Sequence, residues 1–507
     1  MSSSANRIAI NTIVMYVRML FLIVIVFFTS RLLLATLGIE DFGIYSVVGS
    51  VATTFISLKA LFSESVQRYL NHEKGRNSLE GQKTVFSLSI IIHFFLALAF
   101  LLIVEIVGTW IIYNKLDIPP EKLETAYFVF QMTVIAVTIS IFSIPYDAVI
   151  IANEKMGVYA FVTIVDALLK LGAVLAISWI GYNKLKIYSL LLILVPVFTL
   201  LFQLFYCKRF PECKFKRQYD KSLFKGLLSL SGWNFLGNIT FSLVHEGVNM
   251  LLNMFGGLVY NAARTVSYQV KSVASQISSN TIISARPKIM QRAAVDDKSI
   301  VFNNINAISR VSFFTIFLPI CVLLTYTEQL LDLWLVDVPD AASDFTRLLL
   351  IGIAVRSLHD PLNVMYMAYA RIKKMMLIEA VVMVCSLVII YISLKSGAPI
   401  WISFAEMILM EAAIIIGLLI NARIELSFPL HSYIKEVLFP FIITGLLAGV
   451  ICISYICFVP CSGTIDTLFK SILVGITYFV VAIIIMNRKE RNLIIDLISN
   501  KIRKNNG

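Results

Sequence analysis

Runs of apolar residues recur along the whole 507-residue chain, and most reach the ~20 residues that a helix needs to cross a bilayer. Backbone polar groups in lipid must be satisfied within the spanning segment, so runs of this length indicate helices rather than strands. The stretches between the runs are too short for a soluble domain, and the sequence therefore predicts an all-α polytopic membrane protein. The runs are residues 10–37, 42–66, 84–112, 124–146, 157–181, 187–207, 227–255, 301–325, 344–369, 375–395, 399–420, 437–460 and 465–487.

The composition also indicates a membrane protein rather than a nucleic-acid-binding or secreted protein. The chain is 58% hydrophobic and 15% charged, with a formal net charge of +12. That charge could indicate a nucleic-acid partner, but the cytoplasmic loops of membrane proteins collect Lys and Arg in the same way, so we expect no nucleic acid. The first apolar run is too long for a cleaved signal and contains Arg18 and Arg31, which predicts that it is the first spanning helix.

The cysteines and histidines form no recognisable site. The 7 cysteines include no C-x-x-C pair, and the 5 histidines are scattered without metal-ligand spacing. We therefore expect no metal centre and no cofactor.

Residues 258–285 are polar for a membrane protein, and their placement decides the topology. If this segment spans and the N-terminus is cytoplasmic, most of the 43 Lys and Arg fall in cytoplasmic segments. The outer segments then hold Lys115, Lys122, Lys184, Lys186 and Lys395. If the segment does not span, the charge bias of the second half opposes that of the first. The positive-inside rule therefore predicts fourteen spanning helices with both termini cytoplasmic.

A helix over 258–285 would have two different faces. At about 100° per residue, Arg264, Tyr268 and Lys271 follow one stripe, and Val266 and Val273 lie opposite. A spanning helix of this kind places its polar stripe on water, which predicts a basic cavity.

Three pairs of residues indicate an internal duplication. Each pair occupies the same place in its apolar run, and the three separations are nearly equal. The pairs are Gly38 with Gly256, Arg68 with Arg286, and Pro145 with Pro361. Duplication of six helices, an even number, gives two parallel lobes, and substrate sites in such transporters lie at the repeat interface.

The predicted organisation is two six-helix lobes followed by two further helices. The N-lobe covers residues 1–207 and the C-lobe residues 227–420, joined by a basic cytoplasmic loop at 208–226. Residues 421–487 hold helices thirteen and fourteen, and 488–507 form a basic cytoplasmic tail.

Basic residues inside the predicted helices point to an anion. A charge at the bilayer centre costs about 2.5–3.5 kcal/mol on insertion scales, so each needs a partner, an interface or water. Arginine forks and lysine point charges suit phosphate, and a cationic cavity disfavours cationic drugs. The candidates for this cavity are Arg18, Arg31, Lys59, Arg264 and Lys271, with Tyr268 on the same stripe as the last two. Snorkelling to the interface is the alternative for Arg31 and Lys59.

A second set of polar residues is acidic and suggests coupling to Na⁺ or H⁺. Its members on predicted helices 7, 11 and 12 are Glu246, Asn249, Glu379 and Glu406. Asp166 on helix 5 is a further candidate, although its position four residues before Lys170 favours an ion pair. The alternative for the whole set is isolated acids near helix ends or paired with neighbouring bases.

Two stretches carry a family resemblance. One joins predicted helices 1 and 2 and holds Arg31, Leu33, Gly38, Phe42, Gly43, Ile44 and Tyr45. The other is IPYDAVIIANEKMGVYA at 144–160. Both resemble bacterial polysaccharide-unit flippases of the multidrug, oligosaccharidyl-lipid and polysaccharide exporter superfamily.

The resemblance implies an alternating-access transporter in the bacterial inner membrane. It would move undecaprenyl-diphosphate-linked oligosaccharide units of O-antigen, capsule or exopolysaccharide to the outer leaflet. The implied partners are the lipid-linked oligosaccharide, membrane lipids and other polysaccharide-assembly membrane proteins. In related lipid flippases, basic residues on helices 1, 2 and 8 line the cavity, and the candidates above match by helix.

Two other functions stay open. A cation-coupled multidrug antiporter of the same superfamily would share the fold but favour acids such as Asp166 and Glu246. A membrane polysaccharide polymerase or glycosyltransferase usually needs a substantial extramembrane loop, and the outer segments here are short and carry no D-x-D motif. We therefore expect a transporter rather than an enzyme.

Overall fold

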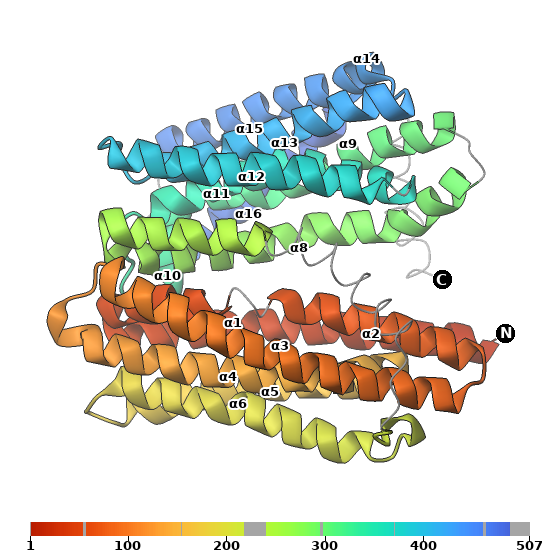
Figure 1. The fold of residues 1–507 in the computed structure, drawn as a ribbon. Coiled ribbons are helices and arrows are strands. Elements are labelled where there is room, and N and C mark those ends of the chain that lie inside the picture. The colour runs from red at the N-terminus through yellow and green to blue at the C-terminus, as the bar shows by residue number, and fades with distance from the viewer. Residues whose placement is uncertain are drawn as a thin grey trace. The chain divides into compact units, whose positions relative to one another are not determined.

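The computed structural model of the chain contains helices and connecting turns throughout the part that it describes, as the apolar runs predict (Figure 1). It describes residues 2–53, 57–153, 155–216, 240–294, 298–369, 371–459 and 463–486. Side chains are described over the same ranges except at 2–17, 51–53, 57–62, 64–65, 277–281, 283–288 and 290–294.

The first half begins with a broken helix. Helix α1 (Ser2–Thr53) is interrupted at Gly38, whose φ of 78° lies in the left-handed region that favours glycine. The break falls where the sequence separates its first two apolar runs. The elements that follow are α2 (Ser57–Gly75), α3 (Leu79–Asn114), α4 (Pro120–Ala152), α5 (Met156–Ser178), α6 (Lys184–Cys207) and the short 3-10 helix η1 (Pro211–Cys213).

The second half repeats the break. A helix at 240–256 ends at Gly256, and Gly257, with a φ of 82°, connects it to α8 (Leu258–Ala294). The left-handed residue therefore lies one position after the glycine that the repeat pairs with Gly38. The remaining elements are α9 (Lys298–Thr325), α10 (Thr327–Trp334), α11 (Ala342–Ala368), α12 (Ile372–Lys395), α13 (Ile402–Leu426), α14 (Leu430–Tyr433), the π-helical turn η2 (Ile434–Leu438), α15 (Phe439–Phe458) and α16 (Thr464–Ile485).

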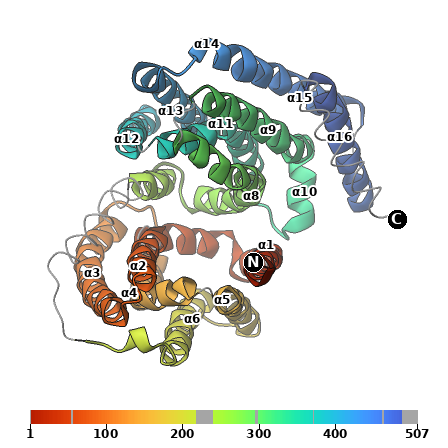
Figure 2. The same cartoon turned by 90° about the vertical axis from the view of Figure 1, so that its right-hand side faces the viewer.

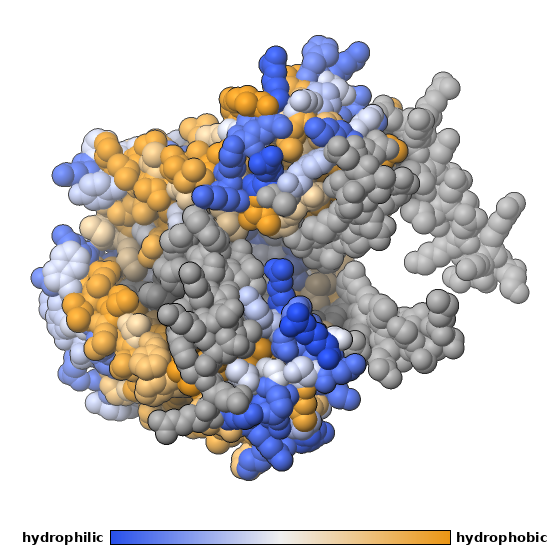
Figure 3. Space-filling view, turned by 45° about the vertical axis from the view of Figure 1, so that its right-hand side comes forward, coloured by the Kyte–Doolittle hydropathy of each residue, from blue (hydrophilic) through white to orange (hydrophobic). Residues whose placement is uncertain are grey.

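Within the described residues, 11 helical segments are long and apolar enough to cross a membrane. Many large apolar side chains lie on their surfaces, including Ile106 of α3 at 71% exposure and Leu446 of α15 at 67%. On the face in Figure 3, hydrophobic residues cover broad areas between hydrophilic patches. The protein is therefore a multi-pass membrane protein. The total of fourteen spanning helices and the cytoplasmic termini stay predictions.

The chain divides into two compact units. Unit 1 consists of Met1–Val266, Trp334–Ala342 and Glu379–Ser403, and unit 2 of Ser267–Leu333, Ser343–Ile378 and Phe404–Gly507. The division falls inside α8, between Val266 and Ser267. The six-helix lobes inferred from the repeat stay a prediction about which helices are duplicated.

Unit 1 is built around α4, which packs against α1, α2, α3 and α6 (Figures 1 and 2). Its core brings Phe130 of α4 together with Val47 of α1 and Phe100 of α3, all nearly fully buried. A buried hydrogen bond from Gln203 Nε2 to Asp147 Oδ1, 2.6 Å long, joins α6 to α4. This bond satisfies a carboxylate that would otherwise be costly to bury.

In unit 2, the two C-terminal helices pack against α9 and against each other. Tyr478 of α16 donates a hydrogen bond to the backbone oxygen of Phe314 over 3.0 Å. Phe317 of α9 packs on the ring of Phe441 in α15, with ring centroids 5.6 Å apart. These contacts make α15 and α16 part of a shared core rather than an isolated appendage.

Gly43 of α1 marks a very close contact within unit 1. A Cβ at this position would overlap the backbone carbonyl of Leu258, whereas a Cβ at Gly49 of the same helix would meet no heavy atom within 4 Å. We expect Gly43→Ala to destabilise the purified protein by roughly 1–3 kcal/mol, because overpacking forces backbone shifts. Thermal unfolding in detergent measures the effect.

Gly49→Ala is the matched control. It is expected to be neutral or stabilising, because alanine favours a helix over glycine by about 1 kcal/mol. Equal unfolding temperatures for the two variants would contradict the close contact at Gly43.

Candidate functional site

Buried asparagines fix the start of α8 against the helix at 240–256. Asn261 Nδ2 donates to the backbone oxygen of Asn249 over 2.7 Å and to its Oδ1 over 2.9 Å. Asn253 Nδ2 donates to Asn261 Oδ1 over 3.1 Å. All three side chains are almost completely buried, so each amide depends on these partners. The three amides set the register of the two helices.

The same asparagine side chains also form hydrogen bonds with α1 and with the turn after α3. Asn253 Oδ1 accepts a 2.7 Å hydrogen bond from the backbone N–H of Asp117. Asn249 Nδ2 donates to the backbone oxygen of Ser46 over 3.4 Å, and the hydroxyls of Ser46 and Thr265 lie 2.6 Å apart. The polar beginning of α8 is thus anchored inside unit 1 at several points.

Arg264 is part of this anchored region. It is 4% exposed, and its Nη2 donates to the backbone oxygen of His245 over 2.7 Å and lies 3.1 Å from the Nδ1 of the same residue. Glu246 lies next to His245, and the Glu246 Oε1 is 3.5 Å from the His245 Nδ1. In this structure the guanidinium holds the helix at 240–256 and does not lie on an open surface.

The next turns of α8 are more accessible. Tyr268 and Lys271 are both half-buried, and the Lys271 ammonium lies 4.8 Å from the centre of the Tyr268 ring. On the opposite side of the helix, Val266 and Val270 are buried, at 1% and 7% exposure, whereas Val273 is half-buried like Lys271. The predicted helix over 258–285 is confirmed by α8. Its polar stripe on water stays a prediction, and Lys271 is a half-exposed cation on that stripe.

The basic candidates of the first helices have different surroundings. Arg18 Nη1 donates to Thr163 Oγ1 over 3.4 Å, and its guanidinium lies 5.3 Å from the centre of the Tyr159 ring. Arg31 is exposed on α1. Lys59 lies outside the residues whose side chains the structure describes. Arg18 and Lys271 thus each rest on a tyrosine, Arg18 in unit 1 and Lys271 in unit 2.

The acidic candidates do not gather into a metal site. Asp166 forms the predicted ion pair with Lys170, 2.7 Å long. Asn249 belongs to the asparagine network, and Glu379 and Glu406 are half-buried on α12 and α13. Among the described residues, no group of three or more His, Cys, Asp and Glu side chains could hold a metal ion.

Unit 2 contains a partly buried cluster of charged residues that the sequence predicted only in part. Arg356 Nη1 donates to Glu411 Oε1 over 2.7 Å, and His359 Nδ1 lies 3.1 Å from Glu411 Oε2. Asp360 lies 3.6 Å from Arg356 Nε. The sequence shows Arg356 and Glu411 as charges within predicted spans. The i, i+3 and i, i+4 spacing of Arg356, His359 and Asp360 on α11 is the signal that would have added the other two.

Known proteins resemble the chain in structure. No protein-family model matches it, and no curated protein matches its sequence. The lipid II flippase MurJ, in an inward closed conformation, superposes with a TM-score of 0.68 at 14% sequence identity, covering 93% of this chain and 98% of that chain.

Transporters of the MOP superfamily match as well. An inward-facing multidrug resistance MATE family transporter gives a TM-score of 0.65 at 14% identity, over 82% of this chain and 95% of that chain. A MOP superfamily transporter from Pyrococcus furiosus, reported with a binding pocket of reverse polarity, gives 0.55 at 13% identity, over 81% and 96%. At such identities the similarity shows the fold, which is MOP-like.

The Glu411 cluster gives a stability prediction. Glu411→Ala removes the carboxylate that both Arg356 and His359 contact. We expect a loss of up to about 3 kcal/mol, because the half-buried Arg356 loses its shorter ion pair and the buried His359 loses its partner. The matched control is Glu328→Ala, whose carboxylate pairs with Arg347 on the surface and is worth about 0–1 kcal/mol. Thermal unfolding in detergent separates the two, and similar losses would contradict a structural role of the cluster.

Proposed function

We propose that the protein is a flippase that moves undecaprenyl-diphosphate-linked oligosaccharide units from the inner to the outer leaflet of the bacterial inner membrane by alternating access. The observation that carries the proposal is the half-buried Lys271, which lies on the polar stripe of α8 above Tyr268. A cation kept at such a position needs water or an anion, because its burial in lipid is costly. The MOP-like fold supports transport, and two of its members are a lipid II flippase and a multidrug transporter.

The sign of the charge favours an anionic substrate. Lys271 and Arg18 are cations whose described neighbours include aromatic rings, which leaves them able to bind phosphate oxygens. Among proteins of this fold, one is reported with a pocket of reverse polarity that suggests a different function. Pocket polarity is thus a property on which members of this fold differ. In this chain the cations Lys271 and Arg18 each favour an anionic substrate such as a diphosphate.

A cation-coupled multidrug antiporter is the second candidate. It would need acids that can receive a cation, and Glu246, Glu379 and Glu406 are half-buried in the described chain. Several acids already have bases beside them, since Asp166 pairs with Lys170, Glu411 pairs with Arg356, and Glu246 lies 3.5 Å from His245. This pairing argues against the antiporter hypothesis. Coupling of the flippase to Na⁺ or H⁺ through the half-buried acids stays part of the proposal.

The transport assay is leaflet exposure of a lipid-diphosphate-linked oligosaccharide in reconstituted vesicles. We expect Lys271→Gln to slow flipping about ten-fold or more, because a hydrogen bond to a charged group contributes about 1.5–3 kcal/mol. Arg18→Gln should act in the same direction. Arg347→Gln, which removes a half-exposed arginine paired with Glu328, is the control and should flip at the wild-type rate.

Two outcomes would contradict the proposal. One is flipping by Lys271→Gln at the wild-type rate in a protein that inserts normally. The other is transport of cationic dyes without movement of the anionic lipid, which would identify the antiporter.

A further inference from the structure

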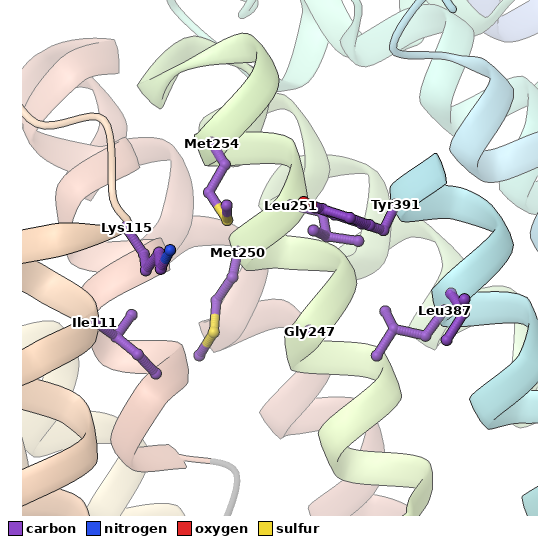
Figure 4. A pocket seen from close by; sticks show the side chains of 9 residues that line it. Ile111, Lys115, Gly247, Met250, Leu251, Met254, Leu387 and Tyr391 are labelled. Carbon is purple, nitrogen blue, oxygen red and sulfur yellow. The ribbon is translucent and has the colours of Figure 1, made fainter. Parts of the chain in front are cut away.

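An apolar groove opens on the side of unit 1, between the end of α3, the helix at 240–256 and α12 (Figure 4). Its volume is about 360 Å³. The residues that line it are Ile111, Lys115, Gly247, Met250, Leu251, Met254, Leu387, Val388 and Tyr391. All of these residues belong to unit 1, and Lys115 is the charged one among them.

The groove has the size and chemistry of a site for a hydrocarbon chain. Its volume lies at the lower end of the roughly 300–1,000 Å³ typical of ligand pockets. Gly247 brings the helix at 240–256 close to Leu387, because a Cβ there would lie 3.1 Å from that side chain. Met250 and Met254 line the groove with flexible thioethers that adapt to irregular apolar ligands.

Helix ends and exposed aromatic residues indicate that one end of the groove is at the level of the membrane interface. Helix α3 ends beside Lys115, and Lys395 is the last residue of α12, one turn beyond Tyr391. Trp110 and Tyr391 are exposed near these ends, and such aromatic residues gather at the headgroup level. The body of the groove therefore extends from the interface into the hydrocarbon.

Two ammonium groups lie at this end. The Lys115 Nζ is 5.2 Å from the centre of the Trp110 ring, and the Lys395 Nζ is 5.8 Å from that of Tyr391. The carboxylate nearest in sequence, Asp117, is not a lining residue, and its backbone is held by Asn253. The mouth of the groove is thus basic and its body is apolar.

We propose that this groove binds one acyl chain of an anionic glycerophospholipid, with the phosphate at Lys115 and Lys395. Basic pockets between spanning helices select anionic headgroups, and the apolar body accepts the chain. The exposed flank at Val388 lets a lipid enter from the bilayer without leaving it. The site lies in unit 1 and does not depend on which substrate the protein transports.

The test is lipid retention by the intact protein in detergent, read by native mass spectrometry. Phosphatidylglycerol and phosphatidylcholine with the same acyl chains are offered together. We expect phosphatidylglycerol to be retained roughly 25-fold over phosphatidylcholine, because each of the two lysines near an anionic headgroup contributes about a factor of five.

Charge variants test the mouth of the groove. Lys115→Gln with Lys395→Gln should abolish the preference for phosphatidylglycerol. The matched control, Lys208→Gln with Lys373→Gln, removes two exposed lysines outside the groove, one of which also lies on an aromatic ring, Phe205. This control should keep the wild-type preference.

A substitution that fills the groove with a larger side chain tests the apolar body of the groove. Met254→Trp should lower retention of both lipids, whereas Val384→Trp, on an exposed part of α12 outside the groove, should not. Equal retention of the two lipids by the wild type, or loss of preference in the control pair, would overturn the proposal. Selective retention of a polyprenyl phosphate over phosphatidylglycerol would overturn it too, since the occupant would then be a transport substrate.

Discussion

The buried asparagine network at the start of α8 is the interaction on which the rest of the account depends. A helix as polar as α8 cannot lie in lipid unless its polar groups find partners or water. Asn249, Asn253 and Asn261 supply those partners for its first turns, and Arg264 adds a further bond to His245 of the same neighbouring helix. The following turns, with Tyr268 and Lys271, are then held as a continuation of an anchored helix.

This arrangement explains why one polar stripe can serve two purposes. At Arg264 the stripe is buried and structural, because the guanidinium satisfies a backbone carbonyl. Two turns later, at Lys271, it is half-exposed and able to meet a ligand. The cations that the sequence presents as equals therefore differ in accessibility.

Much of the fold could be predicted from the sequence, because long apolar runs in a membrane protein permit little besides helices. The break at Gly38 and its counterpart before α8 could be placed to within a residue, since a left-handed backbone favours glycine. The ion pair of Asp166 and Lys170 also followed from spacing alone. Helix α10 was not predicted, because its eight residues lie between two apolar runs, in a polar stretch that is typical of an outer loop.

The partners of single side chains could not be predicted in the same way. Asn249 was predicted as a possible cation ligand, and the structure adds a partner that the sequence did not show, Asn261, twelve residues further along the chain. His359 looked isolated until the fold brought Glu411 to it from α13. Both contacts depend on how two different helices pack against each other, which periodicity within one helix does not show.

The most direct test of the central claim is the water accessibility of α8 in the membrane. Single cysteines would replace Tyr268, Lys271, Ser275, Val266, Val270 and Val273 in a protein whose 7 native cysteines have been removed. A water-soluble maleimide is then applied to the protein in membrane vesicles. A polar stripe on water predicts labelling at Tyr268, Lys271 and Ser275 and protection at the three valines. Equal labelling at all six positions would mean a loop outside the membrane, and protection at all six would mean a dry helix with no cavity for an anion.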